Sequence, residues 1–357
     1  MPLSMLSNSK PQNSQRDLTG RIAGFADWLL RPGNPPAFTD AAQVRNIVII
    51  KPCCLGDMLM ATPAIRAIDQ QFPNAEITIV TDDWTRPAIE TSPRIDRLIL
   101  YPDSSPMRAA VEMAVQMRRF KFDVGVSLDR SPATALALRL AGIPIRAGVD
   151  SASRGIGLTH RTIPEPDQHE TDLYLSVVNQ LGISDSGKHP EFQVPDAAIQ
   201  RAHELLPGGS NHRLVVIHPG GAVNPGVAML EKRWPATSYG ELAGILSADA
   251  GATIVLTGQE TDRNAVETAK QFTRSPVIDL CGQLSLNELA AVAQQSALFV
   301  GNDSGVSHLA SAVGTPVVAL FGPTNPRRYA PLGRRTRICA PEASWSIPEY
   351  GDLRVRS

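Results

Sequence analysis

The sequence of 357 residues has few cysteines, and their spacing excludes two kinds of scaffold. Four cysteines in a chain of this length cannot build a disulfide framework. Cys53 and Cys54 are adjacent, while Cys281 and Cys339 are isolated, so no zinc-binding spacing occurs either. A reducing compartment fits this cysteine content best.

Long apolar runs are also missing. No stretch of 18 apolar residues occurs, which argues against a transmembrane helix. The first 17 residues are polar and lack the apolar core of a secretory signal. We therefore expect a soluble protein of the cytoplasm.

Charge of one sign is not in excess, because 34 Lys and Arg face 35 Asp and Glu. A net charge of −1 argues against binding nucleic acid through a broad basic surface, but it permits a local phosphate site. Aromatic residues make up only 5% of the chain, whereas Ala, Val, Ile and Leu are plentiful. This composition is typical of α/β proteins with parallel sheets covered on both faces, and the length suggests two domains.

Strands and helices alternate in two successive units, as expected of parallel sheets. The first unit has expected strands at 46–51, 75–81, 97–101 and 122–128, with helices up to 72 and at 106–119 and 131–141. The pattern breaks at 150–170, and a helix follows at 170–181. The second unit has expected strands at 213–218, 252–257, 277–280, 297–301 and 316–321, with helices at 236–248, 260–272, 285–296 and 304–313.

The domain boundaries follow from this pattern. Residues 1–42 form an N-terminal extension, expected to be partly disordered with one short helix at 21–31, and 338–357 form a C-terminal tail. That helix either docks on the body or touches a membrane interface, although its three turns and Asp27 weaken the second interpretation. Domains at 43–195 and 196–337 would face a cleft suited to a nucleotide-linked ligand.

In each unit, a glycine-containing turn follows the first strand. Gly56 and Asp57 open the first helix, where Asp57 is either a helix N-cap or a general base. Gly220 and Gly221 suit contacts to phosphate or sugar through backbone N–H groups, or else form a structural turn. Neither turn is a Walker loop or a G-x-G-x-x-G fingerprint.

Two further motifs carry polar groups. Lys232 and Arg233 either neutralise a phosphate or lie on a solvated loop, and Trp234 is expected to pack. Asp303, Ser304 and Gly305 open a helix whose N–H groups would face the strand edge, with His308 one turn further on. The alternative is a capped helix with a core histidine.

Together, these segments resemble glycosyltransferase family 9, the lipopolysaccharide heptosyltransferase family, over residues 45–335. The resemblance lies in Gly56-Asp57 with Thr62-Pro63, in 169–183, 232–235, 256–258, 303–310 and 321–324. It implies two Rossmann-like domains facing a central cleft, the GT-B fold, with acceptor bound mainly at 43–195 and nucleotide-sugar donor at 196–337. It also implies an inverting, metal-independent transfer without cofactor. A heptose or related sugar would pass from an ADP-activated donor to a lipopolysaccharide-core or other glycan acceptor.

The resemblance also implies roles for single residues. Asp57 matches the catalytic base, and Gly56 and Thr62 belong to the acceptor-side loop. The residues that match the donor site are Gly220, Gly221, Lys232, Glu260, Asp303, Ser304, Gly305 and His308. No metal ligand is implied.

Two questions stay open at this stage, the function and the role of a group of arginines. A nucleotide-sugar epimerase of similar fold and a non-catalytic nucleotide-sugar-binding protein are alternative functions. The expected partners are a nucleotide-sugar donor and a glycolipid or saccharide acceptor, without nucleic acid. Five arginines at 327, 328, 334, 335 and 337 either form a solvated face or attract the anionic inner membrane, which would allow peripheral contact there.

Overall fold

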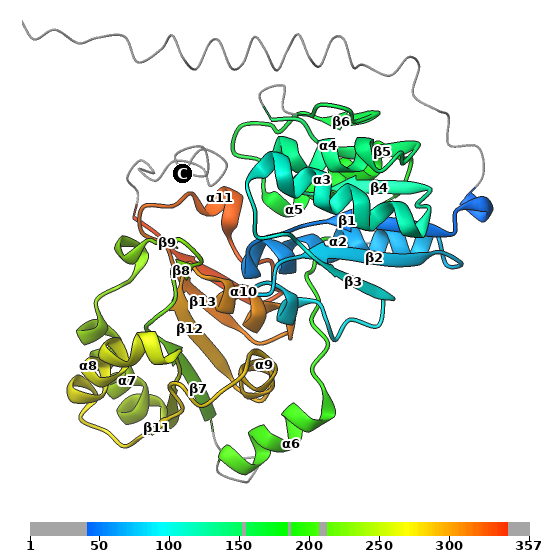
Figure 1. The fold of residues 1–357 in the computed structure, drawn as a ribbon. Coiled ribbons are helices and arrows are strands. Elements are labelled where there is room, and N and C mark those ends of the chain that lie inside the picture. The colour runs from blue at the N-terminus through cyan, green and yellow to red at the C-terminus, as the bar shows by residue number, and fades with distance from the viewer. Residues whose placement is uncertain (1–40, 152–154, 185–186, 207–212, 342–357) are drawn as a thin grey trace, which may run out of the picture.

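The computed structural model describes residues 41–151, 155–184, 187–206 and 213–341. These residues form two α/β domains, each built on a six-stranded parallel sheet (Figure 1). The helix expected at 21–31 and the tail beyond residue 341 lie outside the described residues. The two sheets confirm the predicted pair of Rossmann-like domains.

The first sheet has the strand order β3-β2-β1-β4-β5-β6, the arrangement typical of dinucleotide-binding folds. Its strands are β1 (Asn46–Ile50), β2 (Glu76–Thr81), β3 (Arg97–Leu100), β4 (Val124–Ser127), β5 (Ile145–Val149) and β6 (His160–Thr162). The helices are α2 (Leu55–Gln71), α3 (Pro106–Met117), α4 (Pro132–Leu140) and α5 (Glu170–Asn179), with short 3-10 turns at Ala41–Gln43, Arg86–Ala88 and Arg118–Phe120.

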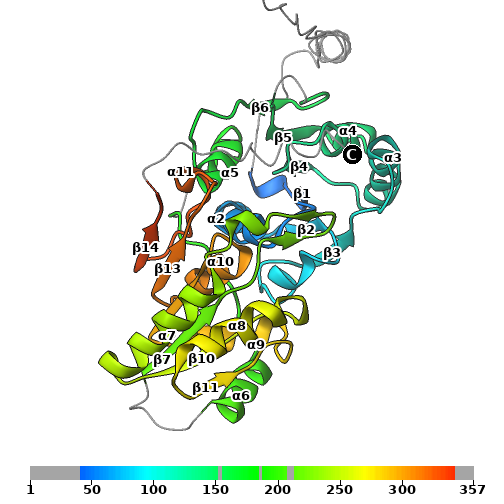
Figure 2. The same ribbon diagram turned by 90° about the vertical axis from the view of Figure 1, so that its left-hand side faces the viewer.

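Burial explains why β1 is central. Its last four residues are fully buried apolar side chains that alternate between the two faces of the sheet. Helices α2 and α5 pack together on one face, and α3 and α4 pack together on the other (Figure 2). The loop between β1 and α2 therefore lies at the carboxyl edge of the sheet, where ligands bind in such folds.

The second sheet repeats the same topology in the order β11-β10-β7-β12-β13-β14. Its strands are β7 (Arg213–His218), β10 (Ala252–Leu256), β11 (Val277–Asp279), β12 (Leu298–Asn302), β13 (Val317–Leu320) and β14 (Thr336–Cys339). The helices are α6 (Asp196–Leu205), α7 (Ala236–Ala250), α8 (Arg263–Thr273), α9 (Leu286–Gln294), α10 (Gly305–Ala312) and α11 (Pro326–Tyr329). A hairpin of β8 (Val223–Asn224) and β9 (Val227–Ala228) and 3-10 turns at Leu230–Lys232 and Glu260–Asp262 complete the domain.

The elements that the sequence analysis missed are short or polar. Strands β5 and β6 lie in or near the segment where the predicted pattern broke, and β6 has only three residues. Helix α6 buries only Ala198 and Ala202 fully, so its apolar stripe is too narrow to stand out, yet it packs against α9. Strand β14 ends at Cys339, two residues beyond the boundary expected at 337.

The contacts between the domains include one helix pair and one cluster of buried charges. Helix α10 of the second domain packs against α2 of the first. Beside them, buried Glu170 accepts hydrogen bonds from Arg130 of its own domain at 2.7 and 2.9 Å and from Arg328 of α11 at 2.8 Å. A buried ion pair of this kind fixes the relative position of the two domains.

This contact removes one residue, Arg328, from the solvated face expected for the arginines at 327–337. Arg328 is buried because Glu170 neutralises it. Arg327 is exposed and lies 3.4 Å from Asp167 of the first domain. Arg334, Arg335 and Arg337 are exposed as well, so only Arg328 of the five is buried.

Within the described residues, no helix combines the length and apolar character needed to cross a bilayer.

Candidate active site

A cleft between the two domains collects most of the residues that the sequence singled out. From the first domain it is lined by the start of α2, including Gly56 and Asp57, and by Trp84. From the second domain it is lined by the loops that follow β7, β10 and β12 and by Tyr329 of α11. The carboxyl edges of both sheets therefore face one shared space.

Asp57 lies in the first turn of α2, and its side chain is 27% exposed. The N-cap of α2 is Cys54, so the interpretation of Asp57 as the helix cap is wrong. Its Oδ2 lies 3.3 Å from Nζ of Lys51, which is buried. Burial raises the pKa of Asp57, and the Lys51 ammonium opposes that shift. Asp57 is thus a cleft carboxylate with increased proton affinity, held by a neighbouring cation.

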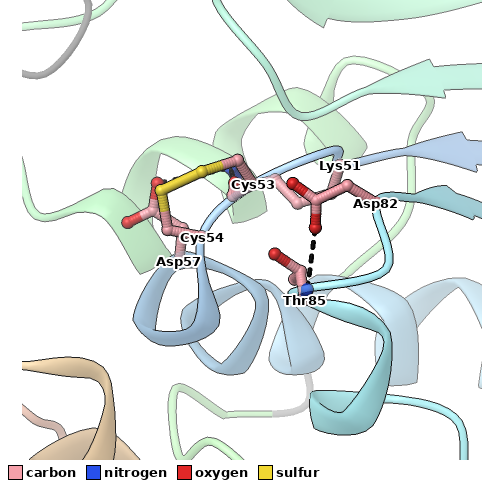
Figure 3. The surroundings of a disulfide bond; sticks show 6 residues. All are labelled: Lys51, Cys53, Cys54, Asp57, Asp82 and Thr85. Atoms are coloured by element: carbon pink, nitrogen blue, oxygen red, sulfur yellow. Dashed lines mark hydrogen bonds and ion pairs between the residues drawn. A yellow bond between two sulfur atoms is a disulfide. The ribbon is translucent and has the colours of Figure 1, made fainter. Parts of the chain in front are cut away.

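The loop before α2 contains a bond that the sequence analysis did not anticipate, a disulfide between Cys53 and Cys54 (Figure 3). It joins neighbours and closes no loop between distant segments, while Cys281 and Cys339 are free thiols. The Lys51 ammonium donates a hydrogen bond to the carbonyl of Cys53 as well as pairing with Asp57. Lys51 therefore ties the disulfide loop to the helix that carries Asp57.

The Gly220–Gly221 turn is held by an ion pair beneath it. Arg233 donates to the carbonyl of Gly221 at 2.7 and 2.9 Å and pairs with buried Asp262 at 2.7 Å. A Cβ on Gly220 would lie 2.2 Å from the Asp262 carboxyl carbon, and Gly221 has a φ of +83°. Only glycines fit here, and Gly221 and Ala222 line the cleft.

Lys232 lies in the cleft wall and not on a solvated loop, as one interpretation had it. Its ammonium is 2.7 Å from Oδ2 of Asp303, which also accepts a hydrogen bond from Thr324 at 2.6 Å. Both Lys232 and Asp303 are buried and line the cleft. The pair brings a cation and an anion to the N-terminus of α10, where Ser304 is the N-cap.

The N-termini of α2 and α10 approach each other closely across the domain boundary. A Cβ on Gly56 would lie 3.0 Å from Cδ2 of His308 and 3.4 Å from the Cα of Gly305. His308 is buried, and this burial lowers its pKa to about 4, so the imidazole is neutral at pH 7. Two helix N-termini, each carrying partial positive charge, therefore face the same cleft.

Three of the predicted site residues do not line the cleft. Gly220 is buried against Asp262, beneath the turn whose Gly221 does line it. Thr62 is buried in α2, where its hydroxyl donates to the carbonyl of Leu59 and accepts from the backbone N–H of Glu191. Glu260 is 75% exposed, pairs with Arg263 at 3.2 Å and does not line the cleft in the described residues. Its neighbours Gln259 and Thr261 line the cleft instead.

The sequence analysis assigned no role to three residues that hold the loops of the cleft in place. Asn302, fully buried, accepts hydrogen bonds from the Trp234 N–H and the Tyr239 hydroxyl and donates to the carbonyls of Pro219 and Gly220. It joins the glycine turn, the Lys232 loop and α7. The other two are Lys51 and Asp262, whose only signal in the sequence was a charged residue beside an apolar strand or loop. Trp234 packs edge-on against Tyr239, as expected, with 5.0 Å between the ring centroids.

Within the described ranges, no three side chains of His, Cys, Asp or Glu gather as a metal site. The polar groups of the cleft are instead a partly exposed carboxylate, a lysine–aspartate pair and backbone N–H groups. Apolar side chains at Leu284, Leu286 and Leu289 line it near the second domain.

Two Rossmann-like domains that face a shared cleft are the GT-B fold, the architecture of many glycosyltransferases. The chain belongs to glycosyltransferase family 9 (heptosyltransferase), whose family model matches residues 111–352. This membership favours glycosyl transfer over the epimerase and over the non-catalytic binding protein.

Individual relatives agree with the family. The chain is 28% identical over 311 residues to lipooligosaccharide heptosyltransferase 2 of Haemophilus ducreyi, covering 82% of this chain and 88% of the relative. It is 25% identical over 309 residues to lipopolysaccharide heptosyltransferase 2 of Escherichia coli, covering 82% of this chain and 87% of the relative. Among solved structures, the glycosyl transferase family 9 protein of Veillonella parvula matches with a TM-score of 0.74 at 25% identity, covering 85% of this chain and 88% of that one.

Proposed function

We propose that this protein transfers a heptose from ADP-heptose to a lipopolysaccharide-core acceptor, with inversion at the anomeric carbon and Asp57 as general base. The observation that carries the proposal is the shared cleft, which Asp57 lines from one domain and Lys232 and Asp303 line from the other. The relatives named heptosyltransferase support the choice of sugar.

Asp57 has the properties that a base for this step needs. A sugar hydroxyl is a poor nucleophile, and a carboxylate that takes its proton as the new bond forms accelerates transfer by about 10²–10⁴-fold. Because burial raises its pKa, Asp57 accepts this proton more readily than a carboxylate in water. The acceptor oxygen bonds to the anomeric carbon as the bond from that carbon to the diphosphate breaks.

The leaving ADP gains negative charge, and the second domain offers groups that stabilise it. Lys232, the residues Ser304 and Gly305 at the N-terminus of α10, and Gly221 and Ala222 of the glycine turn all line the cleft. Preorganised donors of this kind stabilise developing charge without a divalent cation, which is why we propose metal-independent transfer. Asp303 holds Lys232 in place, and Leu284, Leu286 and Leu289 suit the flat apolar faces of adenine.

The proposed substrates set the proposed location. Nucleotide-activated sugars occur in the cytoplasm, and a lipopolysaccharide-core acceptor carries lipid chains anchored in the inner membrane. We therefore propose that the enzyme works in the cytoplasm, in peripheral contact with that membrane.

A donor screen tests the function. Purified full-length protein is mixed with a lipopolysaccharide-core acceptor and with ADP-, UDP-, GDP- or CMP-sugars, including ADP-heptose, in the presence of EDTA. We expect ADP release from ADP-heptose only when acceptor is present, and a product whose anomeric configuration, read by NMR, is inverted. A sugar product formed without acceptor would indicate an epimerase, and activity that needs added Mg²⁺ would exclude metal-independent transfer.

A further inference from the structure

One face of α3 is apolar although it is turned to solvent. Met107, Val111 and Val115 have exposed fractions of 66, 48 and 50%. Their spacing of four residues puts them on one side of the helix. We call these three residues the α3 stripe. The fold does not need it for packing, because α3 buries its other side, at Ala109, Ala110, Met113, Ala114 and Met117.

Positive charge surrounds the α3 stripe. Residues 106–122 contain four cations, Arg108, Arg118, Arg119 and Lys121, and one acid, Glu112. Glu112 pairs with Arg108 at 2.6 Å, and Arg118 donates to the carbonyl of Leu140 at the end of α4. Arg119 and Lys121 are exposed. The chain as a whole has a net charge of −1, so this cationic excess is local.

The α3 stripe begins near the edge of the sheet where the cleft opens. Helix α3 follows β3, whose last residue, Leu100, is 44% exposed and pairs with Thr81 at the end of β2. Trp84, three residues beyond Thr81, lines the cleft. Figure 2 shows α3 on the outer side of the first domain, away from the second sheet.

From these observations we propose that the α3 stripe and its flanking cations dock the enzyme on an anionic lipid bilayer. Apolar side chains would enter the headgroup region, and Arg119 and Lys121 would contact anionic headgroups. The proposal rests on the proposed function, since a lipid-linked acceptor is held in such a bilayer. It assigns the contact to α3, whereas the arginines around 327–337 include one that is buried against Glu170.

Vesicle co-sedimentation of the full-length protein tests this surface. The protein is mixed with vesicles rich in phosphatidylglycerol or with vesicles of phosphatidylcholine alone, and no donor or acceptor is added. We expect binding to the anionic vesicles, weakened by salt, and little binding to the neutral ones. The double variant Val111→Glu/Val115→Glu should lower the anionic-vesicle affinity by about tenfold. Arg119→Glu/Lys121→Glu should lower it by a similar factor while leaving the apolar side chains in place.

A matched control lies in the second domain, where Ile245 of α7 is 56% exposed. Ile245→Glu adds one negative charge at an exposed apolar position of another helix, half of what the Val111→Glu/Val115→Glu variant adds, and should leave vesicle binding unchanged. Equal losses for Ile245→Glu, or wild-type binding by both α3 variants, would overturn the proposal. So would a dimer, seen by light scattering, that only the α3 variants dissociate, because the occupant would then be a second copy.

Vesicle binding tests the docking surface, and turnover on a soluble acceptor tests the proposed function, so the two proposals can fail independently. All variants should retain turnover on a delipidated, water-soluble core acceptor, which also shows that they fold. If the wild type binds anionic vesicles through α3 but turns over no sugar, the proposed function fails and the docking surface remains.

Discussion

The ammonium of Lys51 lies 3.3 Å from Oδ2 of Asp57 and also donates to the carbonyl of Cys53. Lys51 is only 3% exposed, so a single buried cation fixes both the loop that leaves β1 and the carboxylate on the first turn of α2. Two effects on the pKa of Asp57 oppose each other, because burial raises this pKa and the charge of Lys51 lowers it. The proton affinity of the proposed base is therefore set by a balance that mutation can shift.

Asp57→Asn removes the proposed base but keeps nearly the same shape. We expect transfer to fall by about 10²–10⁴-fold, because the amide cannot take the acceptor proton. Donor binding should change little, since the lysine–aspartate pair of the donor side lies in the other domain. Turnover is measured as ADP release with acceptor present, and donor affinity by calorimetry with ADP. A variant with wild-type turnover would show that Asp57 is not the base.

Lys51→Met should shift the pH profile of transfer. Without the ammonium, the pKa of Asp57 rises further, so the base is protonated over a wider range and the acid limb of kcat/KM moves to higher pH. Lys51→Arg keeps the charge and serves as the control. A Met variant that loses activity by the same factor at every pH would mean that Lys51 acts only by supporting the loop.

Gly221 and Gly142 have nearly equal φ angles, so substituting each one distinguishes the cost of backbone strain from an effect on ligand binding. Gly221 has a φ of +83° and Gly142 a φ of +80°, so alanine at either position should cost about 1 kcal/mol in the free energy of unfolding. A Cβ at Gly142 meets no atom within 4 Å, whereas one at Gly221 would lie 2.9 Å from Cβ of Ser304.

Gly221→Ala should therefore also weaken ADP binding, because Ser304 and the turn that lines the cleft must shift. Gly142→Ala should bind ADP as the wild type does. Urea unfolding and calorimetry measure the two effects separately. Equal ADP affinity in both variants would contradict a donor-binding role for the Gly221 turn.

Much of this architecture could be predicted from the sequence, since apolar runs such as 47–50 and 214–217 indicate buried parallel strands. The cleft residues Asp57 and Asp303 were found because each follows such a strand in a motif, and Lys232 was found because it stands beside Arg233 just before Trp234 and Pro235. Thr62 and Glu260 belonged to the same segments but face other surroundings, and motif membership does not determine where a side chain points.

The contacts between the domains could not be predicted in the same way. The ion pair between Glu170 and Arg328 joins residues 158 positions apart, and no sequence pattern links the two. Arg328 looked like one of five solvated cations because burial depends on a partner from another domain. Asn302 likewise has four hydrogen-bond partners that only the folded chain brings together.

Two buried histidines predict how stability responds to acid. Burial lowers the pKa of His218 and of His308 to about 4 in the folded protein, against an ordinary value of 6.5. The unfolded chain therefore binds more protons between pH 6.5 and about pH 4, so stability is full above this window and falls as the pH drops through it. By pH 5, each histidine should cost about 2 kcal/mol in the free energy of unfolding.

The residue that reports this most directly is His308, which lies against Gly56 of the other domain. His308→Gln cannot be protonated, so the urea midpoint should fall less between pH 7 and pH 5 than it does for the wild type. His203→Gln is the control, because His203 lies on the last turn of α6, is exposed and is remote from the cleft. An unchanged pH dependence in His308→Gln would mean that His308 is not held neutral between the domains.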